Sequence, residues 1–174
     1  CGYMLVKGEG FVIRSFKRSD EASIYKHINN TKIAQYTLRI PSPYTRKDAT
    51  EFVSKVLKQQ KMERPLHLNF GIDVGGKIVG GIGLADITAT QAEIGYWLGE
   101  EYWGKGIMTG VVKKIVAYAR KEVGLKKLFA YILEPNTASG RVLEKAGFTN
   151  HGIAKQRKRK DNRVYRLIWY DIEL

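Results

Sequence analysis

The residues best suited to chemistry form the segment Trp103-Gly104-Lys105-Gly106-Ile107-Met108-Thr109, between a strand-like and a helix-like stretch. The first N–H groups of a helix have no partner within the helix, and the helix dipole places partial positive charge there. Glycine lets phosphate oxygens approach these N–H groups without a Cβ in the way, and Lys105 adds a mobile cation. The segment predicts a binding site for a diphosphate; the alternative is a loop that merely turns the chain.

Two better-known phosphate loops do not match this segment. The P-loop needs G-x-x-x-x-G-K-[ST], and no Gly-Lys pair here precedes Ser or Thr. The dinucleotide fingerprint G-x-G-x-x-G fits Gly104 and Gly106, but its third position is Thr109, and Gly110 comes one residue late. The segment therefore indicates a different class of phosphate-binding protein.

Hydrophobic periodicity indicates the elements that position this loop. The expected strands are Phe11–Phe16, Leu66–Val74, Lys77–Ile87, Gln91–Leu98, Lys127–Leu133, Gly152–Lys158 and Val164–Ile172. The expected helices follow Asp20 and Thr45 and span Ile107–Val123 and Asn136–Ala146. This order predicts one α/β domain over residues 1–174, with a mixed sheet.

Local signals mark several boundaries of these elements. Ser19 and Asp20 offer a helix N-cap, and Thr45–Asp48 has the spacing of a capping box. Gly75-Gly76 suits a tight hairpin turn, and Gly124 is placed to end a helix.

Composition limits the class of protein. No apolar run approaches the roughly 20 residues that span a bilayer, and no secretory signal is present, so a cytoplasmic protein without membrane contact is expected. Cys1 is the only cysteine, which excludes an internal disulfide, and a chain that begins with Cys is expected to have been trimmed. The formal net charge of +13 suits polyanionic partners, and Lys155–Lys160 is its densest run. The alternative for that run is a solvated hairpin end.

The three histidines show no metal-ligand spacing. His27, His67 and His151 are scattered along the chain, and no Ser-His-Asp arrangement can be argued from them. We interpret them as structural or surface residues and expect no metal site.

Two stretches together resemble the GNAT acetyltransferases, and within them the branch of bacterial ribosomal-protein N-terminal acetyltransferases. The first is Ala92–Leu98 followed by Tyr102–Thr109, and the second is Asn136, Ser139 and Val142–Phe148. The match covers roughly residues 92–148. It implies a GNAT-like domain whose mixed, mostly antiparallel twisted sheet is flanked by helices, and it implies acetyl-coenzyme A as cofactor.

The resemblance also implies a location for each part of the cofactor. The pantetheine arm would lie beside the strand end at Trp97 and Leu98. The pyrophosphate would lie on the amides of Gly104, Lys105, Gly106, Ile107, Met108 and Thr109. Asn136 and Ser139 would lie near the thioester half. Many family members have Gln or Arg where this chain has Trp103, and Gly or Ala where it has Met108.

Acyl transfer needs a neutral amine, a donor for the oxyanion and, in many enzymes, a proton for the leaving thiolate. We expect the donor to be a backbone N–H on the Trp97–Leu98 strand end, exposed by a splay or bulge. Many GNAT enzymes place a Tyr acid where this chain has Leu143, so Ser139 is the candidate for the thiolate. Glu93 is the candidate base, through water. The alternatives are a helix-surface or capping serine and an exposed strand carboxylate.

The acceptor remains open at this stage. A protein N-terminal α-amine is expected first and a small amine, such as an aminoglycoside or polyamine, second. The competing hypothesis is a basic RNA- or ribosome-binding module that keeps the fold without the chemistry. Ribosome association is compatible with both, and the chain is expected to be a monomer or homodimer.

Overall fold

The computed structural model describes residues 4–158 and 161–174, with backbone only at Lys155, Arg157 and Lys158. Cys1 and most of the basic run Lys155–Lys160 therefore lie outside the described residues or side chains. Within the described part, no helix is long and apolar enough to cross a membrane, and no group of three or more His, Cys, Asp or Glu could hold a metal.

One eight-stranded sheet runs through the molecule in the order β1-β2-β3-β4-β5-β6-β8-β7. Its strands are β1 Leu5–Gly8, β2 Phe11–Arg14, β3 Leu68–Val74, β4 Lys77–Ala85, β5 Gln91–Leu98, β6 Lys127–Leu133, β7 Thr149–Lys158 and β8 Val164–Glu173. All neighbours pair antiparallel except β5 and β6, which are parallel. The predicted mixed, mostly antiparallel sheet is confirmed.

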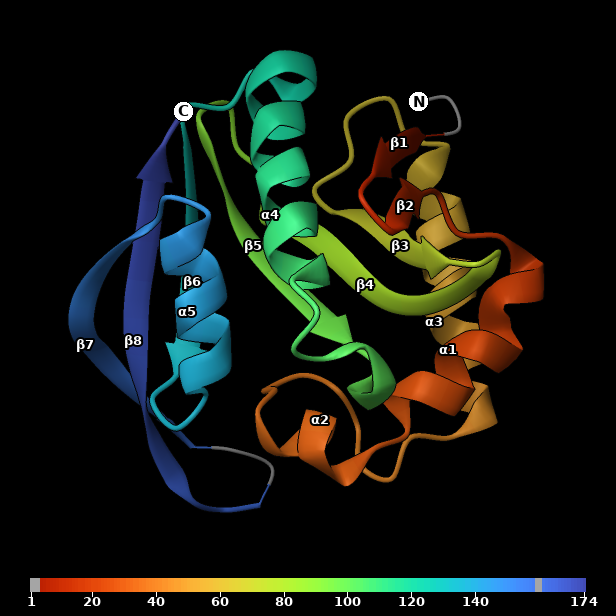
Figure 1. Ribbon diagram of the computed structural model, residues 1–174, viewed down its shortest axis with the longest axis horizontal. Helices are drawn as coiled ribbons and strands as arrows, with labels where there is room; N and C mark the ends of the chain where they lie inside the picture. The colour runs from red at the N-terminus through yellow and green to blue at the C-terminus, as the bar shows by residue number, and fades with distance from the viewer. Residues whose placement is uncertain (1–3, 159–160) are drawn as a thin grey trace.

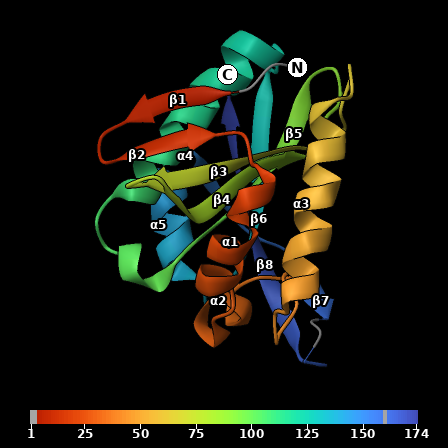
Figure 2. The same cartoon turned by 90° about the vertical axis from the view of Figure 1, so that its right-hand side faces the viewer.

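Helices cover both faces of the sheet, as Figures 1 and 2 show. Helices α1 Glu21–Ile28 and α3 Arg46–Gln60 pack on one face, whereas α4 Ile107–Tyr118 and α5 Thr137–Lys145 pack on the other. The helix α2 Thr31–Gln35 lies beneath the end of β5. Each face has its own apolar cluster, with Ile115 and Leu128 fully buried in one and Ile24 and Val53 in the other. Burial of these side chains holds the helices against the sheet.

Several predicted boundaries are confirmed. Thr45 and Asp48 form a reciprocal capping box at the start of α3. Gly75 and Gly76, both with positive φ, form the turn between β3 and β4. After Tyr118 the helix α4 continues as a π-helical turn over Ala119–Val123, and Gly124, with φ of 79°, ends it.

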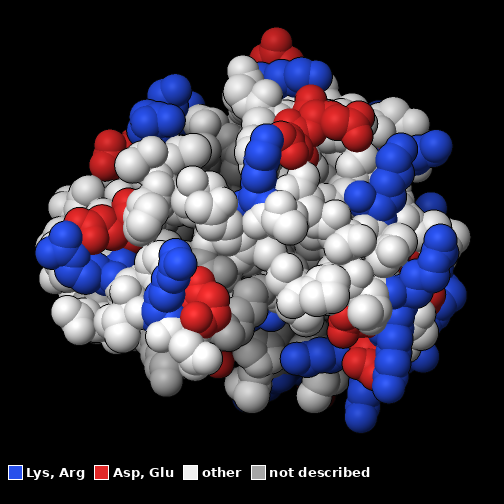
Figure 3. Space-filling view, turned by 90° about the horizontal axis from the view of Figure 1, so that it is seen from below, with Lys and Arg blue, Asp and Glu red and all other residues white. Residues whose placement is uncertain are grey.

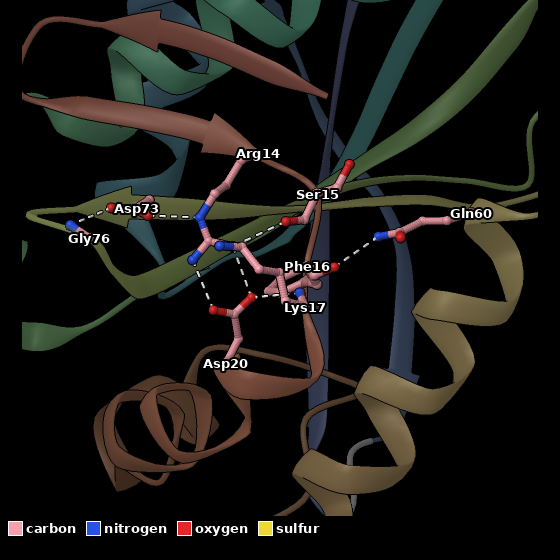
Figure 4. Close-up of polar contacts among 8 residues, drawn as sticks. All are labelled: Arg14, Ser15, Phe16, Lys17, Asp20, Gln60, Asp73 and Gly76. Carbon is pink, nitrogen blue, oxygen red and sulfur yellow. Dashed lines mark hydrogen bonds and ion pairs between the residues drawn. The ribbon is translucent and has the colours of Figure 1, made fainter. Parts of the chain in front are cut away.

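The predicted N-cap at Ser19 and Asp20 is only partly right. Asp20 occupies the N-cap position of α1, but its side chain makes no capping bond. Its carboxylate instead accepts two hydrogen bonds from the Arg14 guanidinium, at 2.8 and 2.9 Å, and one from the Lys17 N–H. Arg14 also donates to Asp73 at 2.7 Å (Figure 4). Both carboxylates raise the pKa of Arg14, and the hydrogen bond that Arg14 donates to Asp20 has the largest effect. These two buried ion pairs join β2, β3 and the start of α1. A capping rule considers only residues that are close in the sequence, so it could not predict them.

Two elements were not predicted. The strand β1 has four residues, alternates only weakly and exists by pairing with β2. The helix α2 has five residues, too few for a helical period, and is capped by Asn30, whose side chain accepts from the Lys32 N–H. Both depend on tertiary contacts that periodicity does not report.

Basic side chains are unevenly distributed over the surface. Figure 3 views the molecule from below. Lys and Arg side chains crowd its right-hand edge, the side on which α1 and α3 lie in Figure 1, whereas the middle of the view is largely uncharged. The net charge of +13 is therefore not spread evenly over this face.

Candidate active site

The sheet splits between its two parallel strands. β5 and β6 are paired only at Gln91–Lys127, Ala92–Leu128 and Glu93–Phe129. Beyond these pairs β5 stays with β4 up to Leu98, and β6 stays with β8 up to Leu133. The two strands therefore diverge and leave facing backbone edges, which is the splay expected near Trp97–Leu98.

Two cavities meet at this splay. The first, of about 420 Å³, lies against the start of α4 and along α5, and we call it the α4 cavity. The second, of about 650 Å³, lies against α3, and we call it the α3 cavity. They share the wall residues Tyr36, Thr37, Tyr96, Trp97, Asn136 and Ser139. A molecule in one cavity can thus reach a molecule in the other across the splay.

The glycine loop opens into the α4 cavity. Gly104 and Gly106 have φ of 72° and 76°, and a Cβ at either would meet no atom within 4 Å. Gly106 is the N-cap of α4, so no side chain covers the helix start, and its first turn holds no acidic residue. The N–H groups of Ile107, Met108 and Thr109 lie in that first turn, which lines the cavity. A helix start of this kind suits an anion.

The α4 cavity brings together the predicted cofactor-binding residues from all three segments. Trp97, Leu98, Gly104, Gly106, Ile107, Met108, Thr109, Asn136 and Ser139 all line it. Lys105 is not in the lining; its ammonium lies 5.5 Å from the centroid of the Tyr102 ring. Glu93 belongs to the α3 cavity alone.

Charge differs between the two cavities. Among described residues, the α4 cavity is lined by the cations Lys32, Arg141 and Lys145 and by no Asp or Glu. The α3 cavity is lined by two cations and three carboxylates, together with His67; the charged residues are Arg39, Lys55, Asp48, Glu51 and Glu93. The first therefore attracts anions, and the second offers carboxylates to a cation or an amine.

The end of β5 presents backbone groups to the splay. The Gly99 N–H donates to the Val79 carbonyl on β4, so by strand alternation the N–H of Leu98 points away from β4, toward the opening. The Leu98 carbonyl points the same way and accepts a 2.7 Å hydrogen bond from the Trp103 indole. Trp103 thus ties the glycine loop to β5, a role that the sequence did not suggest.

The start of α5 is fixed at the splay by three hydrogen bonds. Asn136 is its N-cap, accepts from the Ser139 N–H at 3.3 Å and donates to the Tyr36 carbonyl at 3.5 Å. The buried Tyr96 hydroxyl donates to the Ser139 carbonyl at 3.1 Å, and burial raises the pKa of Tyr96. The Ser139 side chain also interacts with Tyr96, which lowers the pKa of Tyr96 against the larger effect of burial. Ser139 lines both cavities and can therefore also reach a ligand.

Glu93 and Leu143 lie in contrasting surroundings. The Glu93 carboxylate is 3.8 Å from the Arg39 guanidinium, with 22% of its side chain exposed to the α3 cavity. Leu143 has no exposed surface and packs in the main core. Its position therefore offers neither a proton donor nor access to either cavity.

The segment around α2 closes the lower side of both cavities. Glu100, just after β5, accepts from the Asn30 amide at 2.8 Å and from the Lys32 ammonium at 2.5 Å. Tyr36 and Thr37, which follow α2, line both cavities. The sequence did not predict these contacts, because the links between this segment and β5 are long-range.

Comparison with known proteins decides the family. A model of the acetyltransferase (GNAT) domain matches residues 11–149. The chain belongs to the GNAT N-acetyltransferases. These enzymes use acetyl-coenzyme A as acetyl donor.

Individual GNAT relatives agree over most of the chain. The probable N-acetyltransferase YjcK of Bacillus subtilis (strain 168) is 32% identical over 164 residues, which cover 87% of each protein. The structure of RimL, a ribosomal L7/L12 α-N-protein acetyltransferase in complex with coenzyme A, superposes with a TM-score of 0.88 at 18% identity, covering 98% of each chain. Spermidine N-acetyltransferase from Vibrio cholerae, with coenzyme A and spermine, has a TM-score of 0.78 at 20% identity, covering 94% of this chain and 95% of that one. The last two comparisons show the shared fold.

Proposed function

We propose that this GNAT enzyme, acting as one domain, transfers the acetyl group of acetyl-coenzyme A to a protein N-terminal α-amine. The observation that carries the proposal is the pair of cavities that meet at the β5–β6 splay, one cationic and one rich in carboxylates. The cationic α4 cavity takes the polyanionic cofactor, and the α3 cavity takes the amine.

The residues of the α4 cavity fit the cofactor. The amides of Ile107, Met108 and Thr109 hold the pyrophosphate, because Gly104 and Gly106 leave the approach clear. The open edge of β5 at Trp97 and Leu98 takes the pantetheine arm, whose amides can pair with a strand edge. The cofactor supplies the activated acetyl thioester, and it ends at the splay beside Ser139.

Three groups of the chain serve the transfer. The Glu93 carboxylate takes the proton of the incoming amine through water, which leaves a lone pair free to attack the thioester carbonyl. The Leu98 N–H donates to the oxygen on which negative charge develops. The Ser139 hydroxyl donates to the sulfur as the carbon–sulfur bond breaks. Because a thiol has a pKa of about 8.5, the thiolate needs little help at neutral pH.

The site offers a single candidate base, Glu93, and this favours an α-amine as acceptor. An α-amino group has a pKa of about 7.7–8.0, against about 10.4 for a lysine side chain, so a single carboxylate acting through water suffices. RimL acts on a protein α-amine with the same fold. Spermidine N-acetyltransferase shows that the fold also serves a small amine, so the alternative acceptor is a polyamine or another small amine held by the carboxylates of the α3 cavity.

A thiol-release assay with acetyl-coenzyme A tests the proposal. Peptides with free N-termini should release coenzyme A, and the same peptides with blocked N-termini but free lysines should not. Faster release with spermidine or an aminoglycoside than with any peptide would move the acceptor to the small amines. No release with any amine would contradict acetyl transfer by this chain.

A further inference from the structure

We propose that Arg141 and Lys145 on α5 form a separate site for the 3′-phosphate of coenzyme A. The proposal rests on the proposed function, since it assumes that the α4 cavity takes this cofactor. Coenzyme A carries a diphosphate and, on its ribose, a third phosphate with up to two further negative charges. The open start of α4 can hold the diphosphate, so the third phosphate needs cations elsewhere in the cavity.

The fold turns both side chains toward the cavity. Arg141 and Lys145 are four residues apart and therefore share one face of α5. The opposite face is fixed in the core by Gly140 and Leu143. A Cβ at Gly140 would lie 2.4 Å from the Tyr170 hydroxyl, so only glycine lets α5 pack this closely. This packing keeps the face with the two cations along the cavity wall.

The two cations lack partners of their own. No ion pair of the described residues includes Arg141 or Lys145. Like charges four residues apart on one helix face repel each other and destabilise the helix. No carboxylate among the described lining residues offsets that repulsion. A phosphate between the two side chains would remove it.

The other cations near the cavity are already engaged. Lys32 forms an ion pair with Glu100. Lys105 lies over the Tyr102 ring and outside the lining. Arg141 and Lys145 span about 6 Å along α5, since a helix rises about 1.5 Å per residue, and this spacing can bracket one phosphate. The same wall carries Val142, which lines the cavity together with Met108 and Thr109 of α4.

Calorimetric titration with coenzyme A and with 3′-dephospho-coenzyme A tests this site. The wild-type chain should bind coenzyme A about 10- to 100-fold more tightly, as expected for one or two charge-assisted contacts. Arg141→Gln and Lys145→Gln should each lower that ratio about fivefold or more, and the double variant should bring it close to one. The affinity for 3′-dephospho-coenzyme A should not change. Arg120→Gln, an exposed cation beyond the end of α4, is the matched control and should keep the wild-type ratio.

Two results would overturn the assignment. One is equal binding of both ligands by the wild type. The other is a variant that loses the same affinity for both, because that loss would come from general charge or from the fold. If neither ligand bound to the wild type, the cofactor assignment would fail as well, so the two proposals can fail separately.

Discussion

The two cavities share six wall residues yet differ in charge. The α4 cavity has three cations and no carboxylate among its described lining residues, whereas the α3 cavity has three carboxylates and two cations. The overall charge of +13 does not predict this difference, since it would make both cavities basic. What matters is which face of each element a residue occupies. Arg141 and Lys145 lie on the cavity face of α5, and Glu93 lies on β5 in the wall of the α3 cavity alone. The comparison teaches that the placement of charged side chains, and not the net charge, makes one cavity cationic and the other rich in carboxylates.

The largest expected effect comes from closing the α4 cavity. Gly106→Glu places a side chain and a negative charge where φ is 76° and the helix start is open. Losing two or more amide–phosphate bonds should weaken coenzyme A binding by about 100-fold or more in calorimetric titration. Gly75→Glu is the matched control, because Gly75 also has a positive φ and open space around it but lies in the β3–β4 turn. Unchanged affinity in Gly106→Glu would mean that the glycine loop does not bind the cofactor.

A change confined to the α3 cavity should affect the amine instead. Glu93→Gln removes the carboxylate that β5 contributes to the α3 cavity and keeps the size of the side chain. It should lower kcat/KM for the amine by about 10- to 100-fold, which is the lower part of the range expected for a general base. The dissociation constant of coenzyme A should stay at the wild-type value. Steady-state kinetics and titration on the same preparation check both. Equal losses in both quantities would show that the two cavities are not functionally separate.

A substitution in the wall that the two cavities share should have a smaller effect, and mainly on turnover. Ser139→Ala removes the hydroxyl and its interaction with Tyr96 but keeps the backbone hydrogen bonds of Ser139 to Tyr96 and Asn136, so the fold should be unaffected. If the hydroxyl assists the leaving thiolate, kcat should fall about 3- to 10-fold, because a thiolate needs only modest stabilisation near neutral pH. Affinity for coenzyme A should change less than kcat. A wild-type kcat would remove Ser139 from the mechanism.

The smallest expected effect is on the pH dependence of stability, and it comes from His27, which packs on Tyr102 in the wall of the α4 cavity. His27 is buried against Gly99 and packs edge-on against Tyr102, and burial lowers its pKa below the usual 6.5; Glu101 opposes the shift, whereas Lys26 and Lys77 add to it. The unfolded chain therefore binds the proton more readily, so this group's contribution to stability is lost as pH falls below about 6.5. Thermal unfolding between pH 8 and pH 5 should depend less on pH in His27→Gln than in the wild type. If the unfolding temperature of His27→Gln changed with pH as much as that of the wild type, His27 would not contribute to the pH dependence of stability.

The sequence predicted the parts of the fold that rest on local patterns. Thr45 with Asp48, Gly75-Gly76 and the loop at Gly104 and Gly106 need only a few neighbouring residues to define their geometry, and the structure has them all. The strand Gln91–Leu98 agrees as well, since alternation fixes which side chains share a face.

The remaining features depend on residues far apart in the chain. The side chain of Asp20 binds Arg14 in place of the helix end, and Glu100 holds Asn30 and Lys32 across about 70 residues of sequence. Tyr131 and Trp97 reach the same α3 cavity from two strands that separate after three pairs. A splay near Trp97 was expected, but not that Tyr131 would line the cavity opposite it. The roles of Glu93 and Ser139 stay predictions.

A crystal structure of the chain grown with coenzyme A tests the central claim most directly. The account predicts the diphosphate on the N–H groups of Ile107, Met108 and Thr109, and the thiol at the splay beside Ser139. It would be contradicted by a diphosphate bound elsewhere, or by a side chain that covers the start of α4 while the coenzyme lies in the α3 cavity.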